Sequence, residues 1–179
     1  QEPAIPTLLL KLTPLQNPGR HQALASALTT PTADLLHMRP EGTAVVIDDL
    51  PRARWCVGGR TVEGATAPLE IGITAGTNTG EEKARFIAAA FDELQRQLAP
   101  DGVFEVASYV TVRELPATAW GHGGQTQRAR QQARSTVAMV WRACIRLCPP
   151  KPAPKSVTGP AKPGGGLGSR RPPEPLPAA

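Results

Sequence analysis

Residues 50–59 are Leu-Pro-Arg-Ala-Arg-Trp-Cys-Val-Gly-Gly, and residues 115–124 are Leu-Pro-Ala-Thr-Ala-Trp-Gly-His-Gly-Gly. Both segments have the form Leu-Pro-x-x-x-Trp-x-x-Gly-Gly, and an acidic residue, Asp49 or Glu114, precedes each of them. A strand-like apolar run comes before that residue in both cases. Five identities at fixed spacing in matching surroundings indicate a duplication. With only two copies and a period of 65 residues, the pattern predicts two halves of one domain and not a solenoid.

The first copy closes a predicted strand–helix–strand unit. Residues 6–12 form a mostly apolar run that predicts a strand, and we expect it to be buried on both faces. Asn17-Pro18 suits the start of a helix, because asparagine caps and proline needs no donor there. Leucines recur at helical spacing to about Leu36, and a β-branched strand follows at 43–47. Pro31 leaves two possibilities, one kinked helix or two shorter ones.

The second copy closes a unit of the same order. Residues 69–73 alternate apolar and polar side chains, as a half-buried strand does. Thr79 is a candidate N-cap, since two acidic residues follow it and favour the helix dipole. Residues 106–112 form the next predicted strand. The apolar side chains of the helix fall on one stripe, which consists of Phe86, Ile87, Ala90, Phe91, Leu94 and Leu98.

A helix between two strands implies that the strands are parallel and that the crossover is right-handed. Two such units predict an α/β (α+β) domain with a four-stranded mixed sheet and two helices on one face. The repeated Gly-Gly segments are expected to be loops or short hairpins. Because the chain has no further helices to spare except 125–147, we expect neighbouring subunits to cover the other face of the sheet.

The predicted organisation has five parts. Residues 1–5 are a leader or extra N-terminal residues, and the two strand–helix–strand units occupy 6–64 and 65–127. A C-terminal helix is expected at 128–148, and a disordered Pro/Gly-rich basic tail at 149–179. Half of the 20 prolines lie in that tail, which cannot bury enough apolar surface to offset its ordering entropy.

Charge is distributed unevenly along the chain. Residues 1–127 carry a net charge of −4, whereas residues 128–179 carry +9. A body that binds nucleic acid would be basic, so the composition argues against nucleic acid as a partner of the duplicated units. The tail is interpreted as a solvated segment, with a tether to nucleic acid or to an anionic surface as the alternative. It has no interleaved aromatic residues that could stack on bases.

The cysteines do not form a metal-ligand pattern. Cys144 and Cys148 are four residues apart, but no second pair and no nearby histidine accompany them. Cys56, next to Trp55, is expected to pack as a small buried side chain. No apolar run is long enough to span a bilayer, and no secretory signal is visible. We therefore expect no metal and no membrane partner, and a cytoplasmic location with reduced thiols.

The residues resemble the 4-oxalocrotonate tautomerase superfamily. The resemblance rests on Pro6-Thr-Leu-Leu-Leu-Lys-Leu, on a helix of matching length, on the run Ala44-Val45-Val46-Ile47-Asp48-Asp49 and on Trp55 with Gly58-Gly59. It covers about residues 6–127. Two fused units are similar to the branch that includes macrophage migration inhibitory factor and the fused tautomerases. This similarity implies a tandem β-α-β tautomerase fold and a homotrimer with pseudo-sixfold symmetry.

The same resemblance implies a cofactor-independent keto–enol tautomerase. In the family an amino-terminal proline, Pro6 here, moves a proton on an enol or an α-keto acid. A free amino terminus can act as a base near pH 7, because an α-amine has a reference pKa of about 8 and desolvation disfavours its charged form. Behind Ile5, however, the nitrogen of Pro6 is a tertiary amide without a basic lone pair. The reaction therefore requires that Pro6 be exposed as the N-terminus.

Four further residues are candidates for substrate binding by resemblance: Arg39, Trp55, Tyr109 and Trp120. Each also has a structural interpretation. Arg39 can be a solvated turn arginine, and Tyr109 can be a strand aromatic that packs on its neighbours. The two tryptophans can belong to the core or to subunit contacts.

The arginines that short family members use for substrate are absent, because Gln16, Ala44 and Tyr109 stand at those positions. Two hypotheses follow. The chain is a tautomerase acting on a small enol such as a 2-hydroxymuconate or phenylpyruvate, or it is a catalytically inactive oligomeric binding protein on the same scaffold. A hydratase or dehalogenase that uses the same proline is a third possibility. Such relatives need additional arginine and acidic side chains in the pocket, and this sequence does not identify them.

Overall fold

The computed structural model describes residues 6–14 and 19–147, with the side chains described as far as Val140. The described residues up to Val140 belong to one compact unit, and a second unit begins at Trp141. The expectations for residues 1–5 and 149–179, and for the Asn17-Pro18 helix start, lie outside the described residues.

The compact unit is built around one four-stranded sheet with the order β2-β1-β5-β6. Strand β1 (Thr7–Leu12) is parallel to β2 (Ala44–Asp49), and β5 (Leu69–Thr74) is parallel to β6 (Val110–Leu115). The two central strands, β1 and β5, are antiparallel. The predicted mixed sheet is therefore confirmed, and its two halves are related by an approximate twofold axis between β1 and β5.

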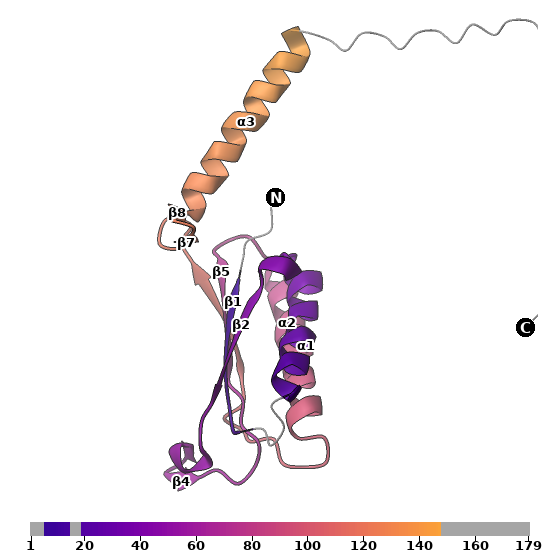
Figure 1. Cartoon of the computed structure of the whole chain (residues 1–179), viewed down its shortest axis with the longest axis vertical. Coiled ribbons are helices and arrows are strands. Elements are labelled where there is room, and N and C mark those ends of the chain that lie inside the picture. Colours follow the sequence, from indigo (N-terminus) through magenta and orange to yellow (C-terminus); the bar gives the residue numbers. More distant parts are fainter. Residues whose placement is uncertain (1–5, 15–18, 148–179) are drawn as a thin grey trace, which may run out of the picture. The chain divides into compact units, whose positions relative to one another are not determined.

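The helices of the two strand–helix–strand units lie on the same face of the sheet, as Figure 1 shows. Helix α1 spans Gly19–Leu36 and helix α2 spans Gly80–Leu98. Pro31 lies inside α1, so of the two possibilities left open by the sequence, the chain forms one helix there. His37 directly follows α1 with φ of 56°, a left-handed residue of the kind that often ends a helix.

The core lies between this face of the sheet and the two helices. Every second residue of β1 is fully buried, and β5 follows the same alternation. The helices contribute residues three to four positions apart, which is the spacing of one helical face. The core side chains from these four elements are Leu8, Leu10, Leu12, Leu69, Ile71, Ile73, Leu24, Leu28, Leu36, Phe86, Ala90 and Leu94.

Each unit ends in a short β-hairpin whose two-residue turn is the Gly-Gly pair of the repeated segment. Strands β3 (Cys56–Val57) and β4 (Arg60–Thr61) form the first hairpin, and β7 (Gly121–His122) and β8 (Gln125–Thr126) form the second. The glycine pairs between them have φ of 57° and 77° in the first copy and 58° and 74° in the second. These values are typical of a type I′ turn, which requires positive φ at both positions. Short 3-10 helices, η1 (Pro40–Gly42) and η2 (Arg52–Arg54), precede β2 and β3.

The structure corrects two of the strand predictions. The strand expected at 106–112 begins only at Val110, because the N–H of Ser108 bonds to the carbonyl of Glu105 and closes a turn. The first strand is not buried on both faces within the chain, since Thr7, Leu9 and Lys11 are exposed. A further helix, α3 (Gln127–Leu147), follows the second hairpin directly.

Candidate functional site

Pro6 lies at the entrance of the central strand β1. It is buried, and its carbonyl accepts a hydrogen bond of 3.1 Å from the N–H of Ala44 at the start of β2. On the other side of β1, Thr7 pairs with Gly72 of β5. The proline is therefore placed between two strands at one end of the sheet, and its nitrogen is bonded to Ile5 in this chain.

The strand register shows which other candidates share this end. Strands β5 and β6 both finish here, because Thr74 pairs with Leu115. The second hairpin follows β6, so Trp120 belongs to the end that carries Pro6. Arg39 also belongs to it, since it directly precedes η1 and β2.

Trp55 and Tyr109 lie at the opposite end. Tyr109 is next to the start of β5, where its carbonyl accepts from the N–H of Leu69 at 2.9 Å. Trp55 follows Leu50, whose N–H bonds to the last residue of β1. Figure 1 shows the two hairpins at opposite ends of the sheet. Within one chain the five predicted site residues are therefore not brought together, and only Arg39 and Trp120 share an end with Pro6.

The individual side chains differ in their surroundings. Arg39 is exposed, and its carbonyl accepts bonds from Gly42 and Thr43. Tyr109 is 58% exposed. Both tryptophans are partly buried. Cys56 is exposed, so the expectation that it would be buried was wrong.

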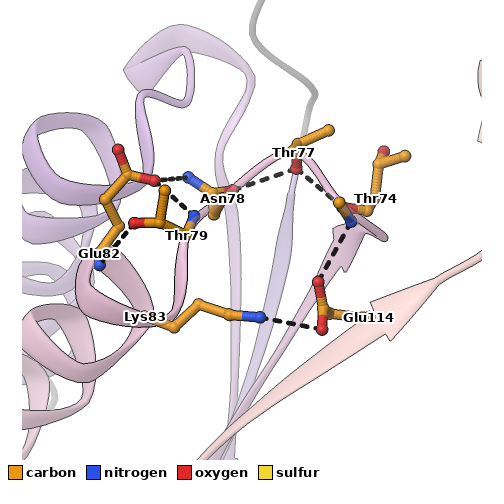
Figure 2. A network of polar contacts seen from close by, with 8 residues as sticks. Thr74, Thr77, Asn78, Thr79, Glu82, Lys83 and Glu114 are labelled. Carbon is orange, nitrogen blue, oxygen red and sulfur yellow. Dashed lines mark hydrogen bonds and ion pairs between the residues drawn. The ribbon is translucent and has the colours of Figure 1, made fainter.

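A polar network occupies the loop between β5 and α2 at the same end as Pro6 (Figure 2). The Thr77 hydroxyl donates to the carbonyl of Thr74 at 2.7 Å and to the side-chain oxygen of Asn78 at 3.1 Å. The Asn78 amide in turn donates to the carbonyl of Leu36, at the end of α1, at 3.2 Å. These bonds connect the loop to the end of β5 and to the end of α1, and a further bond from the Asn78 amide to Glu82 connects it to α2.

Two carboxylates belong to this network. Glu82 accepts from the N–H of Thr79 at 2.8 Å, and Glu114 accepts from Lys83 at 2.9 Å and from the N–H of Gly76 at 3.2 Å. The bond from Thr79 lowers the pKa of Glu82, with smaller contributions from His37 and Asn78. The bond from Lys83 lowers the pKa of Glu114, followed by that from Gly76. Both groups are therefore ionised at neutral pH, and neither can serve there as a proton donor.

Buried donors lie in and beside the second hairpin, and of these the sequence pointed to Trp120 but not to Gln127 or Arg130. Nitrogen Nε1 of Trp120, Nε2 of Gln127 and Nε of Arg130 are buried and have no hydrogen-bond partner among the described residues. Gln127 itself is only 4% exposed. Aligning the two copies could have found it, because the corresponding residue in the first copy is Val62. The backbone N–H of each bonds to the carbonyl of its tryptophan at 3.1 Å.

The described residues lack two features that would indicate other functions, a metal-binding cluster and a membrane-spanning helix. In that part of the chain no group of three or more His, Cys, Asp and Glu side chains could hold a metal ion. None of the described helices is both long enough and apolar enough to cross a membrane.

Comparison with known proteins gives a consistent result. No protein-family model and no curated protein matches the chain. A crystal structure of native fused 4-OT is 29% identical with a TM-score of 0.61, and covers 69% of this chain and 97% of its own. Another fused 4-OT, a wild-type asymmetric trimer, is 27% identical with a TM-score of 0.62 at the same coverage. A macrophage migration inhibitory factor-like protein from Entamoeba histolytica shares the fold at 14% identity, with a TM-score of 0.56 and coverage of 69% of this chain and 99% of its own. The duplicated unit, the strand order and these likenesses together show that the chain has the tautomerase fold in its fused form, and that it is similar to fused 4-OT.

Proposed function

We propose that the protein is a keto–enol tautomerase whose general base is the nitrogen of Pro6 once that nitrogen is the free amino terminus. The observation that carries the proposal is the place of Pro6, buried at the entrance of β1 in a fused tautomerase fold. The neighbouring superfamily structures, which include a malonate semialdehyde decarboxylase at 19% identity, support the family but not one reaction.

The chemistry follows from burial. A secondary amine that is removed from water loses part of its preference for the charged form, so its pKa falls toward neutrality. It can then take the hydroxyl proton of an enol and deliver a proton to the neighbouring carbon, which gives the keto form, or catalyse the same steps in reverse. The carboxylates of the neighbouring loop accept hydrogen bonds from Lys83 and from backbone N–H groups, which lowers their pKa and makes them weaker bases than a desolvated amine.

The test compares three forms of the chain that differ only at the N-terminus. One begins at Gln1, one at Ile5 and one at Pro6, and each is assayed for ketonisation of the phenylpyruvate enol. Only the form that begins at Pro6 is expected to be active. In that form Pro6→Ala is expected to lower kcat by about 100- to 10,000-fold, the usual contribution of a general base. Equal activity of the Ile5 and Pro6 forms would contradict proline catalysis.

A catalytically inactive oligomeric binding protein is the second candidate. Two observations favour it: the nitrogen of Pro6 is an amide in this chain, and the positions of the family's substrate arginines hold Gln16, Ala44 and Tyr109. The same assay separates the candidates, because an inactive Pro6 form that is folded and binds small carboxylates supports the binding protein.

We also propose that the protein assembles as a homotrimer. The face of the sheet opposite the helices exposes Leu9 and Val46, which are 46% and 52% accessible and pair with each other across β1 and β2. Apolar side chains on a sheet face are normally covered. The fused 4-OT structures with the same fold are trimers by description.

A further inference from the structure

The two copies of the repeated segment differ in how their tryptophans are bonded. In the first copy the indole N–H of Trp55 donates to the carbonyl of Leu50 at 3.2 Å. In the second copy the corresponding carbonyl, that of Leu115, accepts from the N–H of Ala75 at 2.9 Å. The indole N–H of Trp120 is buried and has no partner among the described residues.

The sequence explains this difference. A Thr-x-x-x-Asn-x-Gly segment follows both β1 and β5, at residues 13–19 and 74–80, and this alignment places Pro14 opposite Ala75. Proline has no backbone N–H, so in the first copy the carbonyl of Leu50 receives no bond from Pro14. In the second copy the carbonyl of Leu115 accepts the N–H of Ala75 and not the indole.

A second difference between the copies lies next to the same tryptophan. Val62, buried in the first copy, corresponds to Gln127 in the second, whose amide nitrogen has no partner among the described residues. One helical turn later, Arg130 donates through one terminal nitrogen to the carbonyl of His122 at 2.8 Å, while its Nε is buried and unpaired. The second copy thus gains two buried donors besides the indole.

The three nitrogens have a common chemical requirement. Indole and guanidinium nitrogens only donate, and so does the NH2 group of glutamine. A buried donor without an acceptor is unfavourable, whereas in low dielectric a bond to a charged acceptor is strong. Gln127 is next to Trp120, since its N–H bonds to the carbonyl of Trp120, and Arg130 contacts the same hairpin through the carbonyl of His122. A small oxyanion is the kind of acceptor that these donors lack, and the charge of Arg130 favours a carboxylate.

We infer that Trp120, Gln127 and Arg130 bind the carboxylate of the substrate at the end of the sheet that carries Pro6. This inference rests on the proposed function and names the residues of this chain that hold the substrate's carboxylate. The donors take the place of the family arginines that are absent from this sequence. The three nitrogens are covered in this conformation, so the β7–β8 hairpin shifts when the anion enters.

The experiment measures binding to the full chain that begins at Gln1, so the result does not depend on the amine of Pro6. Isothermal titration calorimetry compares 3-phenylpropionate with its amide, which has the same ring but no charge. The carboxylate is expected to bind at least about tenfold more tightly. Trp120→Phe and Gln127→Met are each expected to weaken its binding by about tenfold, the effect of losing one hydrogen bond to a charged group.

The matched control is Gln131→Met, the same change at an exposed glutamine of α3. Gln127→Met is also expected to raise Tm in the absence of ligand, because it replaces an unpaired buried amide by an apolar group of similar size, whereas Gln131→Met leaves Tm unchanged. Equal binding of acid and amide, no binding at millimolar concentration, or equal effects of the two glutamine variants would overturn the inference.

The outcomes also separate this inference from the proposed function. If the chain binds the carboxylate through these donors but the Pro6 form is inactive, only the proposed function fails. If the Pro6 form is active and its KM is unaffected by Trp120→Phe and Gln127→Met, only the inference fails. When both hold, these variants raise KM by about tenfold with little change in kcat, as expected for lost ground-state binding.

Discussion

Glu82 shows how single residues set the start of an element. Its carboxylate accepts the N–H of Thr79, while the Thr79 hydroxyl accepts the N–H of Glu82 at 3.2 Å, so the two form a capping box. His37, at the end of α1, lies 3.2 Å from the same carboxylate. The cap therefore joins the start of α2 to the end of α1.

The cap is expected to make stability depend on pH. Because folding lowers the pKa of Glu82 from its ordinary value of 4.5, its contribution is fully present above that value and is lost as the pH falls through the folded pKa. Glu82→Gln can still accept the N–H of Thr79 but cannot titrate. Its urea midpoint is therefore expected to fall less than that of the wild type between about pH 6 and pH 3.

Glu81→Gln is the matched control, since Glu81 is exposed and takes no part in the capping box. It is expected to keep the wild-type profile. If Glu82→Gln also keeps it, the titration of the cap does not contribute to acid unfolding.

At the scale of elements, the backbone conformation of the hairpin turns determines which residues they can contain. Gly58 has φ of 57°, and a Cβ placed there meets no atom within 4 Å. The space around the turn is therefore open, and glycine is present because of its conformational freedom.

This interpretation predicts different effects for two substitutions of similar size. Gly58→Asn is expected to be tolerated, because asparagine often adopts positive φ in type I′ turns. Gly58→Val is expected to lower the free energy of unfolding by about 1–2 kcal/mol, the cost of a left-handed conformation for a side chain with a branched Cβ. Urea denaturation of the two variants provides the measurement, and equal stability would show that the turn is not type I′ in solution.

At the scale of the whole molecule, the relevant surface is the face of the sheet opposite α1 and α2. Among the described residues these two helices cover one face, and Leu9 and Val46 are exposed on the other.

Leu9→Glu is expected to dissociate the proposed homotrimer into monomers, because a carboxylate buried in an apolar interface lacks a partner. Light scattering coupled to size-exclusion chromatography measures the change. The control is Ile87→Glu on α2, where the isoleucine is 38% exposed on the helical side of the molecule. The proposed interface is wrong if both variants keep the mass of the wild type.

Much of the fold could be predicted because it depends on local patterns. The repeated segment indicated the duplication, the cap at Thr79 marked the start of α2, and the glycine pairs marked the hairpins. The start of β6 could not be predicted in this way. Val106 is β-branched and suits a strand, but it is 84% exposed, because the bond from Ser108 to Glu105 forms a turn around it.

The sequence by itself determined that the chain is a doubled strand–helix–strand unit with Pro6 at the start of its first strand. Only the tertiary structure decided which candidates share an end of the sheet, because that depends on the antiparallel pairing of β1 with β5. It also decided that the indole of Trp55 is bonded, while that of Trp120 has no partner among the described residues. The physical reason is that these bonds join residues distant in the sequence: Ala75 donates its N–H to the carbonyl of Leu115, whereas Pro14 has no N–H to donate to that of Leu50.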